Sequence, residues 1–368
     1  MLTKLAPAGI FLLVALLPAA ISSGASRADA HPATAASGGE RASLAFVRSV
    51  YRFGWRRARV DLITTRADGR GARPLIGKGT NNDLVLEYPG FLSFTRPSWS
   101  PSGNTLAFTA RSGSHLVNID GSDPRLLDRS GAGPLWSPDG QTVVVTRFRV
   151  DEEQQAFFSS LWAMNPDGSN QRRLIPDQKF ALVDAGSFSP RDETLAFTRR
   201  EFSHADPRKA DIYTVGLDGT GMRKLAERAS DPSYSPDGTR IAFATERDEN
   251  GSFSYGHDSY FLAHELYAMN SDGGDEQRLT RTKRINETAP AWSPDGARIA
   301  YRRGRNIYGD EEYAAVFAIN RNGSCPTRVT APLKSRTRTR KGRRGRQVLR
   351  NFGAPAWRLS SAPGPLSC

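Results

Sequence analysis

Several patterns that commonly identify a function are missing from this sequence. Among its 368 residues are only two cysteines, Cys325 and Cys368, and no Cys-x-x-Cys pair, which excludes a zinc ribbon and a thioredoxin-like redox site. No Gly-x-Ser-x-Gly occurs, so the nucleophile elbow of an α/β-hydrolase is absent. After residue 21, no apolar run is long enough to cross a bilayer.

The N-terminus has the order of a secretory signal. A start with one lysine, Met1–Lys4, precedes the apolar run Leu5–Ile21, and small residues then lead to Ala28-Asp29-Ala30. This order predicts a signal peptide over residues 1–30 and a linker over 31–42, and hence export to the periplasm or the extracellular space. A retained membrane anchor is the alternative, which the shortness of the run and its two prolines disfavour.

The net charge of +13 lies mostly in one segment. Nine basic residues and no acidic residue fall between Lys334 and Arg350, and removing these nine leaves +4. The segment is either a solvated loop or a surface that attracts an anionic envelope polymer or lipid headgroups. Export and the lack of interleaved aromatic residues disfavour nucleic acid. The residues expected to contact a polyanion are Lys334, Arg336, Arg338, Arg340, Lys341, Arg343, Arg344 and Arg346.

A repeat fills most of the chain. Five segments share an aromatic residue, then Ser-Pro-Asp-Gly or a variant, then an apolar stretch such as Ile241-Ala-Phe243. They begin at Trp99, Trp136, Phe188, Tyr234 and Trp292. Proline, aspartate and glycine together specify a tight turn, so each copy predicts a β-hairpin, and a second hairpin closed by Asp-Gly or Asn-Gly follows it. Four strands per repeat are typical of a β-propeller blade.

The two ends of the chain supply a sixth blade. Residues Leu44–Ile76 contain the strands of a blade that lacks its first strand, and Pro355–Leu359 is a first strand without a blade. We therefore predict an all-β fold: a six-bladed β-propeller over residues 43–360, closed by N- and C-terminal strands that share one blade. Residues 361–368 form a tail. Seven blades is the main alternative, and closure in either case removes exposed strand edges.

The repeats resemble those of TolB-type propellers, which also occur attached to prolyl-oligopeptidase-like peptidases. The resemblance covers about residues 43–360 and is carried by the five aromatic-Ser-Pro-Asp-Gly-like copies, although Ser102 and Arg191-Asp192 depart from the pattern. It implies a propeller without the peptidase, since only Ser360–Cys368 follow. By analogy with TolB, it implies a non-enzymatic exported scaffold that binds a partner, expected to be a protein, with no cofactor.

The repeated aromatic residues are better interpreted as core than as a sugar-stacking stripe. Trp99, Trp136, Phe188, Tyr234, Trp292 and Trp357 occupy equivalent positions, so we expect them to pack between blades. His115 lies five residues before an Asp-Gly turn, where the other copies have Ile63, Trp162, Tyr213, Tyr267 and Phe317. We therefore expect His115 to be a packed strand residue rather than a metal ligand.

The insertions predict which face of the propeller is functional. The Ser-Pro-Asp-Gly and Asp-Gly turns share one face of an up-and-down blade, and the length variation falls in the connections of the other face. Variable loops on a rigid scaffold commonly carry binding sites. The residues expected to contact a partner there are Trp55, Arg56, Arg57, Phe253, Tyr255, His257, Tyr260 and His264.

One enzymatic alternative uses the same loops. His204, His257 and His264 could serve a propeller lyase or hydrolase that acts on carbohydrate, with carboxylates such as Asp258 and Glu265 nearby. Their spacing matches no short metal motif, so no metal site is predicted.

The two cysteines are expected to form one disulfide. Cys325 follows the Gly323 turn on the short-turn face, and Cys368 lies eleven residues after Trp357, where the closing strand emerges on that face. A Cys325–Cys368 bond would tie the closing strand to its neighbour; two free thiols are the alternative.

Overall fold

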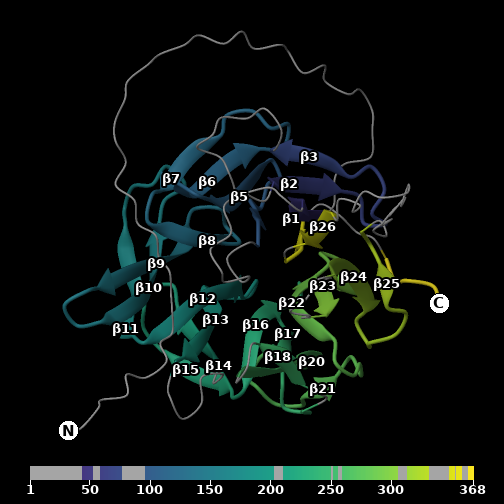
Figure 1. Ribbon diagram of the computed structural model, residues 1–368. Helices are drawn as coiled ribbons and strands as arrows, with labels where there is room; N and C mark the ends of the chain where they lie inside the picture. Colours follow the sequence, from purple (N-terminus) through teal and green to yellow (C-terminus); the bar gives the residue numbers. More distant parts are fainter. Residues whose placement is uncertain are drawn as a thin grey trace, which may run out of the picture. The chain divides into compact units, whose positions relative to one another are not determined.

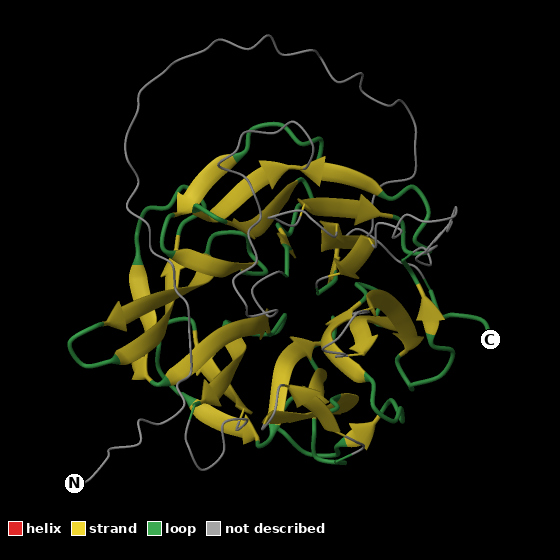
Figure 2. Ribbon diagram, in the orientation of Figure 1, coloured by secondary structure: helices red, strands yellow, loops and turns green. Residues whose placement is uncertain are grey.

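Short apolar runs separated by turns form strands, and the described part of the chain contains no helix (Figure 2). These residues therefore include no helix that could span a membrane. The computed structural model describes residues 44–52, 59–76, 96–202, 210–249, 252–255, 259–305, 313–330, 348–352, 354–358 and 364–368. The strands of residues 44–358 form the six blades of a β-propeller, which confirms the predicted fold (Figure 1).

Blades 2 to 6 each contain four antiparallel strands, with the last strand of each, such as β15 or β21, at the periphery (Figure 1). Blade 2 contains β4 (Ser98–Trp99), β5 (Thr105–Ala110), β6 (Gly113–Asn118) and β7 (Arg125–Asp128). Blade 3 contains β8 (Gly131–Trp136), β9 (Val143–Asp151), β10 (Ala156–Met164) and β11 (Arg172–Lys179). Blade 4 contains β12 (Ala181–Phe188), β13 (Thr194–Glu201), β14 (Ala210–Gly216) and β15 (Arg223–Ala226).

Blade 5 contains β16 (Ala229–Tyr234), β17 (Arg240–Thr245), β20 (Glu265–Asn270) and β21 (Gln277–Arg278). Between its two middle strands lies a separate hairpin of β18 (Ser252–Tyr255) and β19 (Ser259–Leu262). Blade 6 contains β22 (Asn286–Trp292), β23 (Arg298–Arg305), β24 (Tyr313–Asn320) and β25 (Thr327–Arg328).

Blade 1 closes the ring from both ends of the chain. Its strands β1 (Leu44–Arg52), β2 (Arg59–Thr65) and β3 (Arg73–Ile76) are N-terminal, and β26 (Val348–Phe352) and β27 (Ala356–Trp357) are C-terminal. β26 and β27 both pair antiparallel with β1. The predicted shared blade is therefore confirmed. The predicted basic loop ended at residue 350, but its last three residues belong to β26 because they pair with β1.

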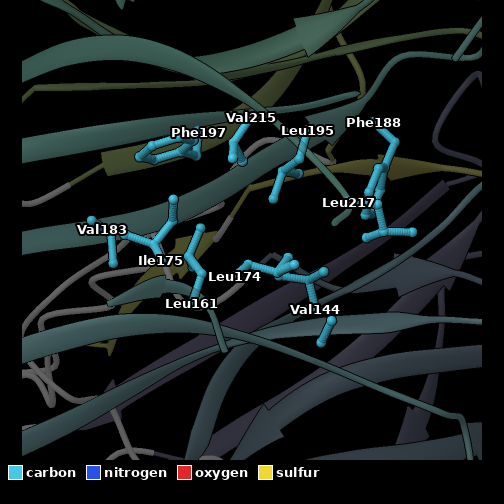
Figure 3. Close-up of a cluster of buried hydrophobic side chains, with 11 residues drawn as sticks. Val144, Leu161, Leu174, Ile175, Val183, Phe188, Leu195, Phe197, Val215 and Leu217 are labelled. Atoms are coloured by element: carbon cyan, nitrogen blue, oxygen red, sulfur yellow. The ribbon is translucent and has the colours of Figure 1, made fainter. Parts of the chain in front are cut away.

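The hydrophobic core lies between neighbouring blades. Among the described residues are six buried clusters, and each takes side chains from two adjacent blades. In the cluster of Figure 3, Leu161 and Leu174 of blade 3 pack with Leu195 and Phe197 of blade 4. Another cluster joins Phe46 of blade 1 to blade 6 and so completes the ring. Each blade thus needs two neighbours to bury its apolar faces.

The repeated aromatic residues take part in these clusters. Trp99, Phe188, Trp292 and Trp357 are buried, as predicted, whereas Trp136 and Tyr234 are only half-buried at the edge of their clusters. Two of the indole N–H groups also reach the neighbouring blade: Trp99 Nε1 donates to the carbonyl of Ala356 at 3.2 Å, and Trp357 Nε1 donates to the carbonyl of Ala291 at 2.9 Å.

His115 is a packed strand residue, as predicted. It is buried in β6 opposite Phe108, with ring centroids 5.7 Å apart, and its Nδ1 lies 3.0 Å from the carbonyl of Gly113. Burial lowers its pKa. The same cross-strand position holds a ring pair in three other blades, for example Phe197 with Tyr213. The repeat, not a ligand, accounts for this histidine.

The predicted disulfide is present. Cys325 and Cys368 are bonded, with their Cα atoms 5.1 Å apart. The tail before Cys368 docks on blade 6: the Gly364 N–H donates to Asp295 Oδ2 at 2.6 Å, and the Leu366 N–H donates to Asn320 Oδ1 at 2.6 Å. The bond therefore fastens a tail that is already hydrogen-bonded to the blade beside the closing strand.

Candidate binding face

The antiparallel blades sort the connections onto two faces. We name one side the turn face. It carries the connections between the first and second strands and between the third and fourth strands of each blade, for example residues 100–104 and 119–124 of blade 2. Every turn-face connection between the described strands has five to seven residues. The loop face is the opposite side, and it receives all four stretches longer than seven residues: 77–97, 202–209, 246–264 and 329–347. This is the face on which the sequence predicted the length variation.

Most of the predicted contact residues cannot be assigned contacts. Trp55, Arg56, Arg57 and His257 lie outside the described residues, as do His204 and the eight basic residues from Lys334 to Arg346. Phe253, Tyr255 and Tyr260 belong to the β18–β19 hairpin, in which Phe253 pairs with Phe261 and Tyr255 with Ser259. The structure therefore places these three on one extra hairpin of blade 5.

His264 is the one predicted contact residue whose side chain is described. Its Nδ1 lies 3.0 Å from Asn286 Oδ1, which also accepts the backbone N–H of His264 at 3.1 Å. Its Nε2 lies 3.9 Å from Glu246 Oε2. These contacts link the end of the long 246–264 connection to the first strand of blade 6.

A buried glutamate, Glu287, lies next to Asn286 in the chain. The backbone N–H of Glu287 donates to the carbonyl of His264 at 2.9 Å, and the Glu287 side chain is fully buried. Burial raises the pKa of Glu287, while Thr280 and the guanidinium of Arg303, whose Nε lies 3.5 Å from Glu287 Oε1, oppose the rise. The Glu287 carboxyl thus takes up a proton at a pH at which an ordinary glutamate is ionised.

Tyr301 shares this environment. Its side chain is fully buried, and burial, reinforced by the charge of Glu287, raises the pKa of its hydroxyl. The cluster of Glu287, Tyr301 and Arg303 lies between the first two strands of blade 6, where Glu287 pairs with Arg303. The side chains of Glu287 and Tyr301 are both buried inside the blade, where burial favours their neutral forms.

Glu265, by contrast, has a repeated structural role. It pairs with the guanidinium of Arg278, and its Oε1 accepts the Thr282 N–H at 2.7 Å. Asp211 does the same one blade earlier: it accepts the Arg228 N–H at 3.1 Å. An acid at this position fixes the connection to the next blade. Within the described residues, no three histidine, cysteine or acidic side chains gather so as to hold a metal ion.

One arginine crosses the axis of the ring. Arg96, which precedes β4 of blade 2, donates from Nη1 to the carbonyl of Gly186 at 3.2 Å and from Nη2 to that of Pro290 at 3.3 Å. These carbonyls belong to the first strands of blades 4 and 6. Arg96 therefore joins three alternate blades across the centre.

The turn face carries one described cleft. Its volume is about 670 Å³, and it lies between blades 4 and 5. Beside it is the turn at Arg191-Asp192, which departs from the Ser-Pro-Asp-Gly pattern of the repeat. Arg191 Nε donates to the carbonyl of Asp237 at 2.6 Å and so bridges the two blades. Burial raises the pKa of Tyr234, which lines the cleft, to about 12.

Glu287 and Arg96 were not singled out from the sequence, although each differs from the residues at the equivalent position of other repeats. Glu287 lies five residues before its aromatic residue, where other copies have Gly131, Val183 and Ala229, so it is an acid in a small or apolar column. Arg96 precedes a proline and is the one basic residue at a position where the other proline-containing copies have Gly133, Asp231, Ala289 and Ala354. Comparing equivalent positions between repeats would have found both.

Comparison with known proteins agrees with this architecture. The chain is 36% identical over 107 residues to the Tol-Pal system protein TolB of Gluconobacter oxydans, a match that covers 28% of this chain and 22% of TolB. It is 26% identical over 179 residues to the uncharacterized peptidase YuxL of Bacillus subtilis, covering 46% of this chain and 24% of YuxL. The chain is homologous to the TolB-like propellers. It spans less than a quarter of the length of either relative.

Three further comparisons limit what this homology shows. The uncharacterized protein Atu1656 of Agrobacterium fabrum is 25% identical over 216 residues, covering 55% of this chain and 68% of that protein. No protein-family model matches the chain. Among solved structures, a chain of the nidogen/laminin complex superposes with a TM-score of 0.56 at 13% identity, covering 88% of this chain and all of that chain. That likeness shows the propeller fold alone.

Proposed function

We propose that this protein is an exported scaffold that binds a protein partner through its loop face. The observation that carries the proposal is the one-sided distribution of connections: every stretch longer than seven residues between the described blade strands leaves from that face. A closed ring of blades gives these loops a rigid base, and loops on a rigid base are where binding residues concentrate.

Three observations support the finer parts of the proposal. The related TolB is named as a Tol-Pal system protein, which is consistent with a role among other proteins. The Cys325–Cys368 bond suits an oxidising compartment, and the N-terminal segment has the order of an export signal. Within the described residues, His264 and Glu265 are engaged in holding the scaffold together, and no three histidine, cysteine or acidic side chains gather so as to hold a metal ion.

The test replaces the β18–β19 hairpin and asks whether binding is lost. Residues 252–262 are exchanged for a short Asn-Gly turn, which leaves His264 and the strands of blade 5 intact. The tagged full chain is crosslinked in the cells that produce it, purified, and its bound proteins are quantified. We expect the partner recovered with the wild type to be lost from this variant and retained by a control with Met222→Ser, an exposed residue of the turn face. Equal recovery by all three proteins would contradict the proposal.

A further inference from the structure

The middle hairpin of blade 3 extends beyond those of its neighbours. β9 and β10 have nine residues each and pair from Met164 with Val143 out to Ala156 with Asp151, whereas β5 and β6 have six each. The far end of this hairpin lies on the loop face, since β9 leaves its turn-face connection at Val143. There Phe148 is 41% exposed and Val150 is 44% exposed.

A second aromatic residue joins the same surface from the connection to blade 4. Phe180 is 42% exposed and has a φ of 51°, a left-handed conformation that bulky side chains rarely adopt. Hydrogen bonds hold it there: its N–H donates to the Phe157 carbonyl at 3.0 Å, and its carbonyl accepts the Phe202 N–H at 2.9 Å. Arg228 has the same left-handed conformation directly before β16, so the connection between blades sets this backbone, and at position 180 the connection carries a phenylalanine.

The rings form one continuous surface. Phe157 pairs directly across from Val150, and its ring centroid lies 6.0 Å from that of Phe180 and 5.3 Å from that of Phe202. We name Phe148, Val150, Phe157, Phe180 and Phe202 the aromatic patch. Contiguous exposed apolar surfaces on soluble proteins mark interaction sites, and aromatic residues dominate the energetics of such sites.

The charges around the patch indicate what it accepts. Arg149 lies over the ring of Phe158 at 4.1 Å and pairs with Asp151 at 3.2 Å, so this cation is already engaged. The hairpin tip carries the exposed acids Glu152 and Glu153. Within the described part of the chain, no basic side chain forms an ion pair with either of them. Lys179 also lies next to the patch: its Nζ is 5.5 Å from the centroid of the Phe180 ring and donates to Gln154 Oε1 at 3.4 Å. The two glutamates outnumber this lysine, so the net charge of the groups outside these ion pairs is negative.

We propose that the aromatic patch binds a protein segment in which an apolar anchor residue is followed by lysine or arginine. The anchor packs among Phe148, Phe157 and Phe180, and the basic residues face Glu152 and Glu153. An anionic lipid surface would be repelled by the acidic tip. This proposal deepens the proposed function by naming the surface and the kind of segment it accepts.

The test uses two fluorescein-labelled peptides and measures fluorescence anisotropy with the full chain. One peptide has a Leu-Trp anchor followed by two lysines, and the other has the same anchor followed by two glutamates. We expect the basic peptide to bind about tenfold more tightly than the acidic one. Phe148→Thr, which keeps a strand-forming residue, and Phe180→Asn, which tolerates the left-handed backbone, should each weaken binding about tenfold.

Two controls make the result decisive. Met222→Ser removes a residue that is 57% exposed on the turn face and should leave binding unchanged. The double variant Glu152→Gln and Glu153→Gln should abolish the preference for the basic peptide while leaving the melting temperature unchanged. Equal affinity for the two peptides, or equal binding by wild type and both phenylalanine variants, overturns the proposal. A concentration-dependent dimer that Phe148→Thr abolishes also overturns it, because the occupant is then a second copy.

The two proposals fail separately. If the crosslinked partner is lost on removal of the β18–β19 hairpin but retained by Phe148→Thr and Phe180→Asn, the loop face binds and the aromatic patch does not. If the partner is retained by the hairpin variant as well, the loop face itself is not the binding surface.

Discussion

Trp99 Nε1 donates a hydrogen bond of 3.2 Å to the carbonyl of Ala356, 257 residues further along the chain. The donor belongs to the first strand of blade 2 and the acceptor to β27, the C-terminal strand that completes blade 1, so the bond fastens the end of the chain to the neighbouring blade. Trp357 repeats the contact with blade 6. Tryptophans at two equivalent positions of the repeat therefore help to close the ring. The closed ring gives the loops of one face a fixed base.

Closure also depends on close backbone contact at Gly69. This residue has a φ of 81°, and a Cβ atom on it would lie 1.7 Å from the carbonyl oxygen of Val329 in blade 6. Gly69→Ala should lower the free energy of unfolding by roughly 3 kcal/mol or more, because it adds a clash to left-handed strain. Gly71→Ala is the matched control: its φ is 64° but nothing lies within 4 Å, so a loss of about 1 kcal/mol is expected. Urea denaturation measures both, and equal losses would mean that blades 1 and 6 do not touch here.

The disulfide should stabilise the closed ring. It closes a sequence separation of 43 residues, for which loop entropy gives about 4 kcal/mol as an upper figure. Reduction and alkylation should lower the urea midpoint and add the mass of two alkyl groups to the intact protein. Alkylation of unreduced protein, with the same mass gain, would show that Cys325 and Cys368 are free.

Glu287 should make stability depend on pH in an unusual direction. Its folded pKa is raised above the ordinary value of 4.5, so over the range between the two the folded chain holds a proton that the unfolded chain releases. Its contribution is therefore favourable at low pH and is lost as pH rises through the raised pKa. Glu287→Gln should be more stable than the wild type at neutral pH and should lose that advantage below the ordinary value.

The control for this prediction is Glu265→Gln. Glu265 is ion-paired with Arg278 and accepts the Thr282 N–H, so removing its charge should destabilise the protein at neutral pH. Thermal melts of the three proteins across the acid-to-neutral range measure both effects. A Glu287→Gln variant that is less stable than the wild type at neutral pH would show that Arg303 outweighs burial.

The basic segment gives a separate, salt-dependent prediction. If the eight basic residues from Lys334 to Arg346 attract an anionic polymer, binding to immobilised polyphosphate should weaken steeply as salt rises, because counterions are released on binding. Replacing all eight by serine should abolish retention. Retention that ignores both salt and the substitution would contradict a role for this segment.

The sequence predicts the repeated features of this fold and misses the singular ones. Six blades, the shared closing blade, the buried Trp99 and the Cys325–Cys368 bond follow from patterns that recur or from the position of the two ends. Proline, aspartate and glycine act locally, so the turns that they form can be predicted from each copy of the repeat alone. In one such turn, Ser235 Oγ donates to Asp237 Oδ1 at 2.6 Å and helps lower the pKa of Asp237 to about 2.

The missed features depend on contacts between distant segments. The left-handed backbone of Phe180 is held by bonds to Phe157 and Phe202, and neither is evident from the residues around position 180. Arg96 was not recognised because its acceptors, at Gly186 and Pro290, lie in two other blades. Among the predicted partner contacts, His264 is the only one whose side chain can be compared with the structure.

Site-specific photo-crosslinking tests the central claim of a single working face most directly. A photoreactive amino acid is placed singly at Gln154 and Glu249 of the loop face and at Gln141 and Met222 of the turn face, all exposed. The full chain is irradiated in the cells that produce it, and crosslinked proteins are identified by mass spectrometry. The account predicts a common partner from the two loop-face positions and none from the other two. A partner captured from Gln141 or Met222 alone would contradict it.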